Sequence, residues 1–284
     1  MRIQGWLLAL VLLAFTGHGI ARNSEVPIEA SMVVTGHVDI EADGTVSAHS
    51  LDQRDKLPGF VTALIERQAP RWRFEPYEVD GAPVAARAKM SLRVVAEPVE
   101  GSDDYALRID NAHFGAQGES DAETARLRRK NMRPPVYPDS MLARGVEGVA
   151  YVVLKIGRDG KVEDMVVERV NLYGRSSESD LRDMRRLFAL STRRAARSWT
   201  FDVPTTGPDA DDDYWMARVP VAYRLTTSQA AGPGEWDAYV RGPREELPEW
   251  MRRSRSGDSD AMLAGGLQLL GGNERRLLTP LQEG

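Results

Sequence analysis

Histidines are the residues of this chain best suited to catalytic proton transfer, and their positions do not favour an active site. The chain has four histidines, and His37, His49 and His113 all stand in its N-terminal half, outside the clearest structural motifs. No motif pairs one of them with a nucleophile. The chain has no cysteine, which excludes thiol catalysis, thiolate metal sites and disulfides. We therefore expect no enzymatic activity and no catalytic residues.

The acidic run Asp209–Asp213 is the one stretch that suggests a metal site. Aspartates are typical ligands of calcium, but this run lacks the Asp-x-Asp-x-Asp-Gly spacing and the following glutamate of a calcium-binding loop. A solvated loop explains the run equally well. We expect neither a metal ion nor a cofactor.

A group of arginines between residues 182 and 197 is the strongest local concentration of charge. These arginines could form a patch for acidic partners, including lipid headgroups. The interpretation we favour here is a solvated helix face that is partly paired with Asp180 and Asp183. The formal net charge of the whole chain is −5, which argues against a nucleic-acid partner.

The best-defined secondary structure is predicted between Arg133 and Leu225. A helical turn at 139–144 precedes a strand at 149–156 in which every second residue is apolar, and Asp159-Gly160 suits a tight hairpin turn. Helical and then alternating apolar patterns indicate one helix and a last strand. The helix face consists of Leu181, Met184, Phe188 and Ala195, and the strand face consists of Val219, Val221, Tyr223 and Leu225. This order predicts an α+β unit: a short antiparallel sheet, made of the hairpin and the last strand, covered by the helix.

This stretch resembles the C-terminal domain of TonB, the energy-transducing protein of Gram-negative envelopes. The resemblance rests on Tyr137-Pro138, the turn at Asp159-Gly160, and the helix that ends in Trp199-x-Phe201. It implies a sheet edge that takes a short segment of an outer-membrane receptor as an added strand. The candidate partner-binding residues on that edge are Val219, Val221, Tyr223 and Leu225. Two residues depart from the family pattern: Pro220 lacks an N–H group, and Leu142 stands where transducers often have glutamine.

A shorter copy of the same unit is predicted in the N-terminal half. Residues 34–40 alternate in polarity up to a turn at Asp43-Gly44, and a helical pattern from Phe60 to Ile65 leads to Trp72-Arg73-Phe74. The longer second copy is expected to carry an insertion near 174–180.

Five segments are therefore expected along the chain. They are a signal peptide at 1–21, a diverged TonB-like domain at 25–98, a linker at 99–130 with at most one short edge strand, a TonB-like domain at 131–226, and a partly ordered tail at 227–284.

The N-terminal residues have the pattern of a secretory signal peptide. Arg2 precedes an apolar run from Trp6 to Phe15, and small residues follow at Gly19-Ile20-Ala21. Cleavage would place the mature protein in the periplasm. The alternative is an inner-membrane anchor, because residues 3–21 carry no formal charge and approach the length of a span. In that case, the family resemblance implies that His18 contacts an inner-membrane motor of the ExbB/ExbD type.

Three functions follow as alternatives. The first is a periplasmic protein that binds an outer-membrane receptor or another envelope protein by strand addition. The second is an anchored energy transducer that supports TonB-dependent transport across the outer membrane, although no long proline-rich spacer follows residue 21. The third is a structural module that forms homodimers through its sheet edges.

Overall fold

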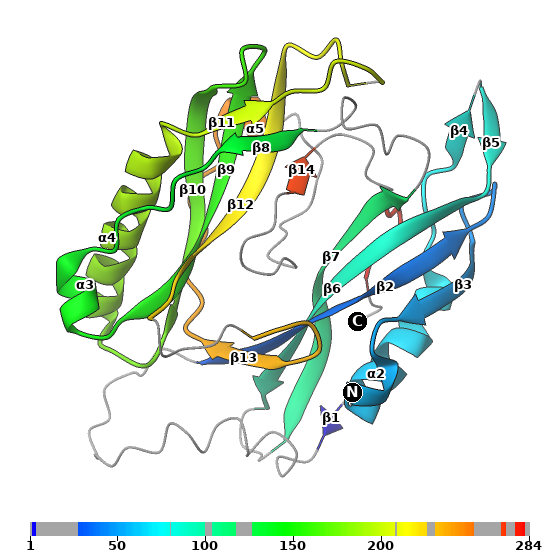
Figure 1. Ribbon diagram of the computed structural model, residues 1–284. Coiled ribbons are helices and arrows are strands. Elements are labelled where there is room, and N and C mark those ends of the chain that lie inside the picture. Colours follow the sequence, from blue (N-terminus) through cyan, green and yellow to red (C-terminus); the bar gives the residue numbers. More distant parts are fainter. Residues whose placement is uncertain are drawn as a thin grey trace.

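The computed structural model describes most of the chain outside its N-terminal segment. The described residues are 2–3, 28–79, 81–99, 104–117, 127–207, 209–225, 231–252, 268–270 and 276–281. Two antiparallel sheets dominate them, and each sheet carries one long helix on the face turned away from the other sheet (Figure 1). The predicted α+β class, with antiparallel sheets and few helices, is confirmed.

The first sheet has the strand order β1-β7-β6-β2-β13, and β3 also pairs with β2. Its strands are β1 (Arg2–Ile3), β2 (Glu29–Ile40), β3 (Val46–Leu51), β6 (Ala86–Pro98), β7 (Tyr105–Gln117) and β13 (Trp236–Tyr239). Helix α2 (Gly59–Gln68) covers one face, flanked by the 3-10 turns η3 (Arg54–Lys56) and η4 (Ala69–Arg71), and β4 (Tyr77–Val79) and β5 (Ala82–Val84) form a separate hairpin. Val34 and Val38 of β2 pack with Val61 and Ile65 of α2 in the first core.

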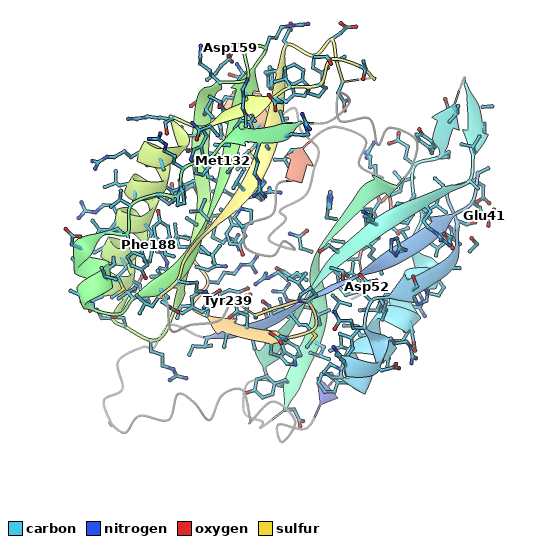
Figure 2. The ribbon with its side chains drawn as sticks, viewed as in Figure 1. Glu41, Asp52, Met132, Asp159, Phe188 and Tyr239 are labelled. Atoms are coloured by element: carbon cyan, nitrogen blue, oxygen red, sulfur yellow. The ribbon has the colours of Figure 1, made fainter. Side chains whose placement is uncertain are left out.

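The second sheet has the order β10-β9-β12-β14. Its strands are β9 (Glu147–Gly157), β10 (Val162–Tyr173), β12 (Tyr214–Tyr223) and β14 (Gln268–Leu270), and the elements around it are β8 (Arg128–Asn131), α3 (Asp139–Ala143), α4 (Glu178–Ala196), β11 (Thr200–Asp202) and α5 (Glu249–Arg252). Ser177 caps α4 because its side chain accepts the N–H of Asp180 at 3.2 Å. Phe188 packs from α4 into the second core (Figure 2).

The hairpin turns of the two sheets have the same construction. Gly44 and Gly160 have positive φ angles of 83° and 73°. Their carbonyl oxygens accept the N–H groups of Phe74 and Phe201, both at 2.8 Å. A Cβ atom on Gly44 or Gly160 would lie 2.0 or 2.1 Å from the carbonyl oxygen of the same phenylalanine. Only glycine fits either turn, since both the φ angle and the close approach exclude a side chain.

The strand order β3-β2-β6-β7 of the first sheet corresponds to β10-β9-β12-β14 of the second. In both sheets a hairpin is followed by the covering helix and then by the strand that pairs with the first hairpin strand. The greater length of the second copy lies in β10, with 12 residues against 6 in β3, and in α4, with 19 residues against 10 in α2. The extra residues therefore lengthen regular elements, and they do not form the insertion expected near 174–180.

Residues expected to form a linker and a tail contribute strands to both sheets. Residues 105–117, within the expected linker, form all of β7 and pair with β6 over its whole length. Within the expected tail, β13 joins the first sheet, β14 joins the second sheet, and Leu277 forms a bridge with Phe74. The short edge strand expected in the linker is therefore part of β7, but its full length and the strands of the tail depend on partners far away in the sequence.

None of the helices in the described part of the chain is long and apolar enough to cross a membrane. Of the expected signal peptide or anchor, only Arg2 and Ile3 are described, and they pair with β7. Trp6–Phe15, His18 and the expected cleavage site lie outside the described residues.

Candidate functional site

The outer edge of β12 is the place where the predicted partner strand would add. β12 pairs with β9 from Tyr214 to Tyr223, but it pairs with β14 only at Met216, Ala217 and Arg218. Among the described residues, none pairs with the outer edge from Val219 to Tyr223. The backbone groups of such an edge are available to an extended chain.

The corresponding edge of the first sheet is filled by the chain itself. Ile40 precedes Gly44 by the same number of residues as Ile156 precedes Gly160. Ile40 pairs with Ala86 of β6, and Ile156 pairs with Trp215 of β12. This register aligns β6 with β12. In this alignment, the three residues of β12 that pair with β14 correspond to the three residues of β6 that pair with residues 115–117 of β7. β7 continues along β6 as far as Pro98, whereas β14 covers three residues only.

The side chains of the predicted edge residues point into the second core. Val219, Val221 and Tyr223 are all buried beneath α4. The Tyr223 ring stacks on Phe188 with centroids 4.2 Å apart, and its hydroxyl lies 2.8 Å from Thr192 Oγ1. These side chains hold the strand in place, so a partner strand on this edge would meet the outward-facing backbone groups of β12 and none of these three side chains.

Leu225 and Tyr137 lie at the end of the same strand. Leu225 follows β12, and its N–H donates to Glu147 Oε1 at 2.5 Å. The Tyr137 ring makes edge contacts with Phe188 and Tyr223, and its hydroxyl donates to the carbonyl oxygen of Val146 at 2.5 Å. Burial raises the pKa of the Tyr137 hydroxyl. Tyr137 therefore packs against the end of β12 and keeps it on the sheet.

The opposite face of β12 carries a buried ion pair that the sequence did not reveal. Arg218 is fully buried, and its Nε donates to Glu168 Oε2 of β10 at 2.9 Å, across the central strand β9. Arg244 reaches Oε1 of the same carboxylate at 2.6 Å. The only signal in the sequence was a charged residue within an apolar strand, between Ala217 and Val219.

Residues 236–245, here called the strap, join the two sheets. Its first four residues form β13 on β2. Val240 and Leu172 of β10 then exchange two backbone hydrogen bonds, of 2.8 and 3.1 Å, and the N–H of Glu245 donates to the carbonyl oxygen of Glu168 at 2.8 Å. The strap thus occupies the edge of β10 at two points, which leaves β12 as the open edge of the second sheet among the described residues.

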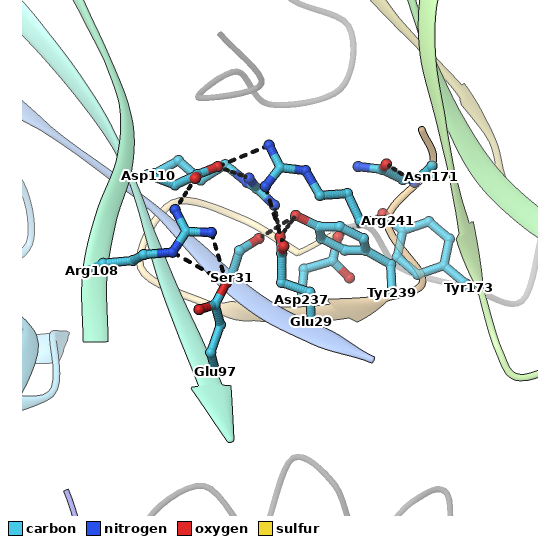
Figure 3. Close-up of polar contacts among 12 residues, drawn as sticks. Glu29, Ser31, Glu97, Arg108, Asp110, Asn171, Tyr173, Asp237, Tyr239 and Arg241 are labelled. Atoms are coloured by element: carbon cyan, nitrogen blue, oxygen red, sulfur yellow. Dashed lines mark hydrogen bonds and ion pairs between the residues drawn. The ribbon is translucent and has the colours of Figure 1, made fainter. Parts of the chain in front are cut away.

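A cluster of charges, here called the polar seam, fastens the strap to the first sheet (Figure 3). It consists of Glu29, Arg93, Asp110, Tyr239 and Arg241. Arg93 donates to Asp110 at 2.6 Å and also to Glu29, while Arg241 reaches Glu29 at 3.3 Å and Asp110 at 3.0 Å. The Tyr239 hydroxyl donates to Glu29 at 2.9 Å. Arg108 also donates to Asp110, so three guanidinium groups contact these two carboxylates, and the buried charges are paired.

A second contact fastens the strap to the second sheet. The Tyr173 hydroxyl of β10 donates to Asp237 Oδ2 of β13 at 2.6 Å, and the Arg224 guanidinium lies 3.7 Å from the centre of the Tyr173 ring. Burial raises the pKa of the Tyr173 hydroxyl and also that of the Asp237 carboxyl. Both groups are buried, and the hydrogen bond between them joins β10 to the strap.

The other candidates for chemistry lie apart from this edge. His37 and His49 are on β2 and β3, and His113 is on β7 of the first sheet. In the acidic run, the carbonyl oxygens of Asp211 and Asp212 accept Arg158 Nη1 at 3.1 and 3.3 Å. Within the described ranges, no group of three histidine, aspartate or glutamate residues is arranged to hold a metal ion.

Comparison with known proteins gives little further information. No family model matches the chain, and no curated protein matches it. Among solved structures, the solution NMR structure of the TonB C-terminal domain of Pseudomonas aeruginosa is similar to part of the chain. The match has 23% sequence identity, covers 39% of this chain and 97% of that domain, and has a TM-score of 0.27. A TM-score this low supports no conclusion about function.

Proposed function

We propose that this chain is a TonB-like envelope protein that binds an extended segment of a partner protein by strand addition to β12. The observation that carries the proposal is the partly covered edge: β14 pairs with Met216–Arg218, and no described residue pairs with the five residues that follow. The equivalent places on β6 are filled by β7. The partner is an outer-membrane receptor or another envelope protein, and the site of action is the periplasm.

The geometry favours an antiparallel partner of about five residues, because β7 and β14 both run antiparallel to the strands they extend. β12 pairs with β9 without a register shift, so Pro220 and Ala222 present their backbones to the same side. Proline has no backbone N–H, so Pro220 is best accommodated if its backbone faces away from β9, toward the open edge. A partner would therefore gain one donor fewer at Pro220 than on an ordinary strand.

Site-specific photo-crosslinking in envelope preparations tests this proposal. Ala222 is exposed, and a photo-reactive residue at this position should give a crosslinked envelope protein. The matched control is Ala48 of β3, which is also exposed. A proline substitution at Val221 is not a suitable test of the edge, because Val221 is buried and replacing it would disturb the core. Equal crosslinking from positions 48 and 222, or none from either, would refute the proposal.

Compartment and anchoring are tested by the mature N-terminus. Mass spectrometry of the protein from periplasmic and inner-membrane fractions should find a start at Arg22 in the soluble periplasm. A retained Met1 in the inner membrane would instead support the anchored energy transducer.

A structural role through dimerisation is the second candidate, because β7 offers another edge. Of its thirteen residues, only Tyr105 and Ala106 have a described partner on the side away from β6, namely β1. Two copies of such an edge can pair with each other. Light scattering over a range of concentrations should show a dimer if this edge assembles, and a monomer at every concentration would refute the idea.

A further inference from the structure

The solvent-exposed side of α4 and the neighbouring segment 133–144 form one surface, here called the basic face. Leu190 stands at the centre of its helical part. Arg186 precedes Leu190 by one turn, and Arg193, Arg194 and Arg197 follow it at three, four and seven residues, which places them on the same side of the helix. Between residues 174 and 198 the chain has seven arginines and three carboxylates, although its overall charge is negative.

The arginines of the basic face are largely without partners. Within the described residues, the side chains of Arg133, Arg182, Arg193, Arg194 and Arg197 form no ion pair or hydrogen bond. The helical carboxylates, Glu178, Asp180 and Asp183, all lie in the first two turns of α4. The helix dipole favours cations near the C-terminus of α4, but it does not account for Arg133 or Arg182.

Exposed aliphatic side chains lie among these arginines. Val136, Leu142 and Leu190 are 79%, 52% and 51% exposed, and they are three of the five large apolar residues classed as exposed in the described part of the chain. The Ser191 hydroxyl donates to the carbonyl oxygen of Val136, which holds Val136 against α4. Leu142 belongs to α3, beside α4 (Figure 1). The surface formed by α4 and residues 133–144 therefore carries exposed aliphatic side chains together with unpaired arginines.

We infer that the basic face docks on an anionic lipid bilayer. Arginine pairs well with lipid phosphate groups, and exposed aliphatic side chains between the arginines can enter the headgroup region. A convex helix suits a broad surface better than a groove does. Nucleic acid is the less suitable polyanion, because none of the exposed large apolar residues on this face is aromatic and available for base stacking. This inference is independent of strand addition at β12.

Vesicle co-sedimentation of the full chain tests the inference. The protein should bind vesicles that contain phosphatidylglycerol, bind pure phosphatidylcholine vesicles poorly, and dissociate as salt is raised. The triple variant Arg193→Gln, Arg194→Gln, Arg197→Gln should lower the partition coefficient by about a hundredfold at low salt, since each basic residue near such a surface contributes about fivefold. Leu190→Gln should lower it several-fold and leave most of the salt dependence.

The matched control is Arg54→Gln, Arg67→Gln, Arg71→Gln, which changes the net charge equally around α2 on the first sheet. This control should bind vesicles like the unaltered chain. Equal losses in both triple variants would show that only net charge matters and would overturn the inference. The inference would also be overturned if the unaltered chain did not bind anionic vesicles, or if it bound single-stranded DNA more tightly than these vesicles. Circular dichroism checks that each variant keeps its helices.

Discussion

Replacing Glu168 by glutamine should destabilise the second sheet strongly. Glu168 and Arg218 have side chains that are 3% and 0% exposed, and two of their atom pairs lie 2.9 and 3.3 Å apart. The substitution keeps the shape of the side chain but removes its charge. Arg244 can turn toward water, since its side chain is 32% exposed, whereas Arg218 cannot. Leaving one buried charge without its counter-charge costs about 3–5 kcal/mol.

This cost is a large fraction of the free energy of unfolding of a typical domain, about 5–15 kcal/mol. With an unfolding slope of about 1–3 kcal/mol per molar urea, the midpoint of Glu168→Gln should fall by more than about 1 M. Urea unfolding followed by tryptophan fluorescence measures the shift, because Trp199 and Trp215 lie in the second core.

Two further variants separate the buried charge from other effects. Glu163→Gln removes the carboxylate that pairs with Lys155 at 2.8 Å on the surface, and it should cost less than about 1 kcal/mol. The double variant Glu168→Leu, Arg218→Met removes both buried charges and should recover most of the loss. If Glu168→Gln costs no more than Glu163→Gln, the reasoning about the buried pair is wrong.

Three other outcomes are expected. Gly160→Ala should cost more free energy of unfolding than Gly174→Ala in urea, because both glycines have positive φ but only a Cβ on Gly160 would meet a carbonyl oxygen at 2.1 Å. Burial raises the pKa of Tyr173 in the folded chain, whereas an unfolded tyrosine loses its proton at a pH of about 10. The free energy of unfolding should therefore fall as the pH rises above about 10. Tyr173→Phe should make this fall less steep in urea unfolding measured at several pH values. Leu270→Asp should loosen β14 and speed amide hydrogen exchange at Met216 and its neighbours on β12, whereas unchanged exchange would show that β14 contributes little protection.

The repeated unit was predictable because local patterns carry it. Asp43-Gly44 and Asp159-Gly160 indicated the two turns, and the structure confirms that Gly44 and Gly160 need positive φ. Most of the helix face of α4 was also readable from spacing: Leu181, Met184 and Phe188 are buried as predicted, whereas Ala195 is only partly buried and the face continues at Thr192 and Ala196. The alternation in the last strand placed Val219, Val221 and Tyr223 on one buried side of β12, but the predicted Leu225 lies beyond the end of that strand.

Residues with charged side chains were the main source of error. Frequent Gly, Asp, Glu and Ser made residues 99–130 look like a linker with one short edge strand, but Arg108 and Asp110 pair with Glu97 and Arg93 of β6 along the thirteen-residue β7. Arg218 likewise gave no sign of its partner fifty residues away. A charged residue is expected to be exposed to solvent unless its ion-pair partner is known, and here the partners lie in distant segments of the sequence.

The sequence by itself determined the local elements: the turns that require glycine, the amphipathic helices and the alternating strands. These depend on φ angles and on side-chain periodicity, which are properties of neighbouring residues. Only the tertiary structure decided which edges are filled. β7, the strap and β14 occupy strand edges through backbone hydrogen bonds that any sequence can form. The open part of β12, on which the proposed function rests, is therefore a property of the fold.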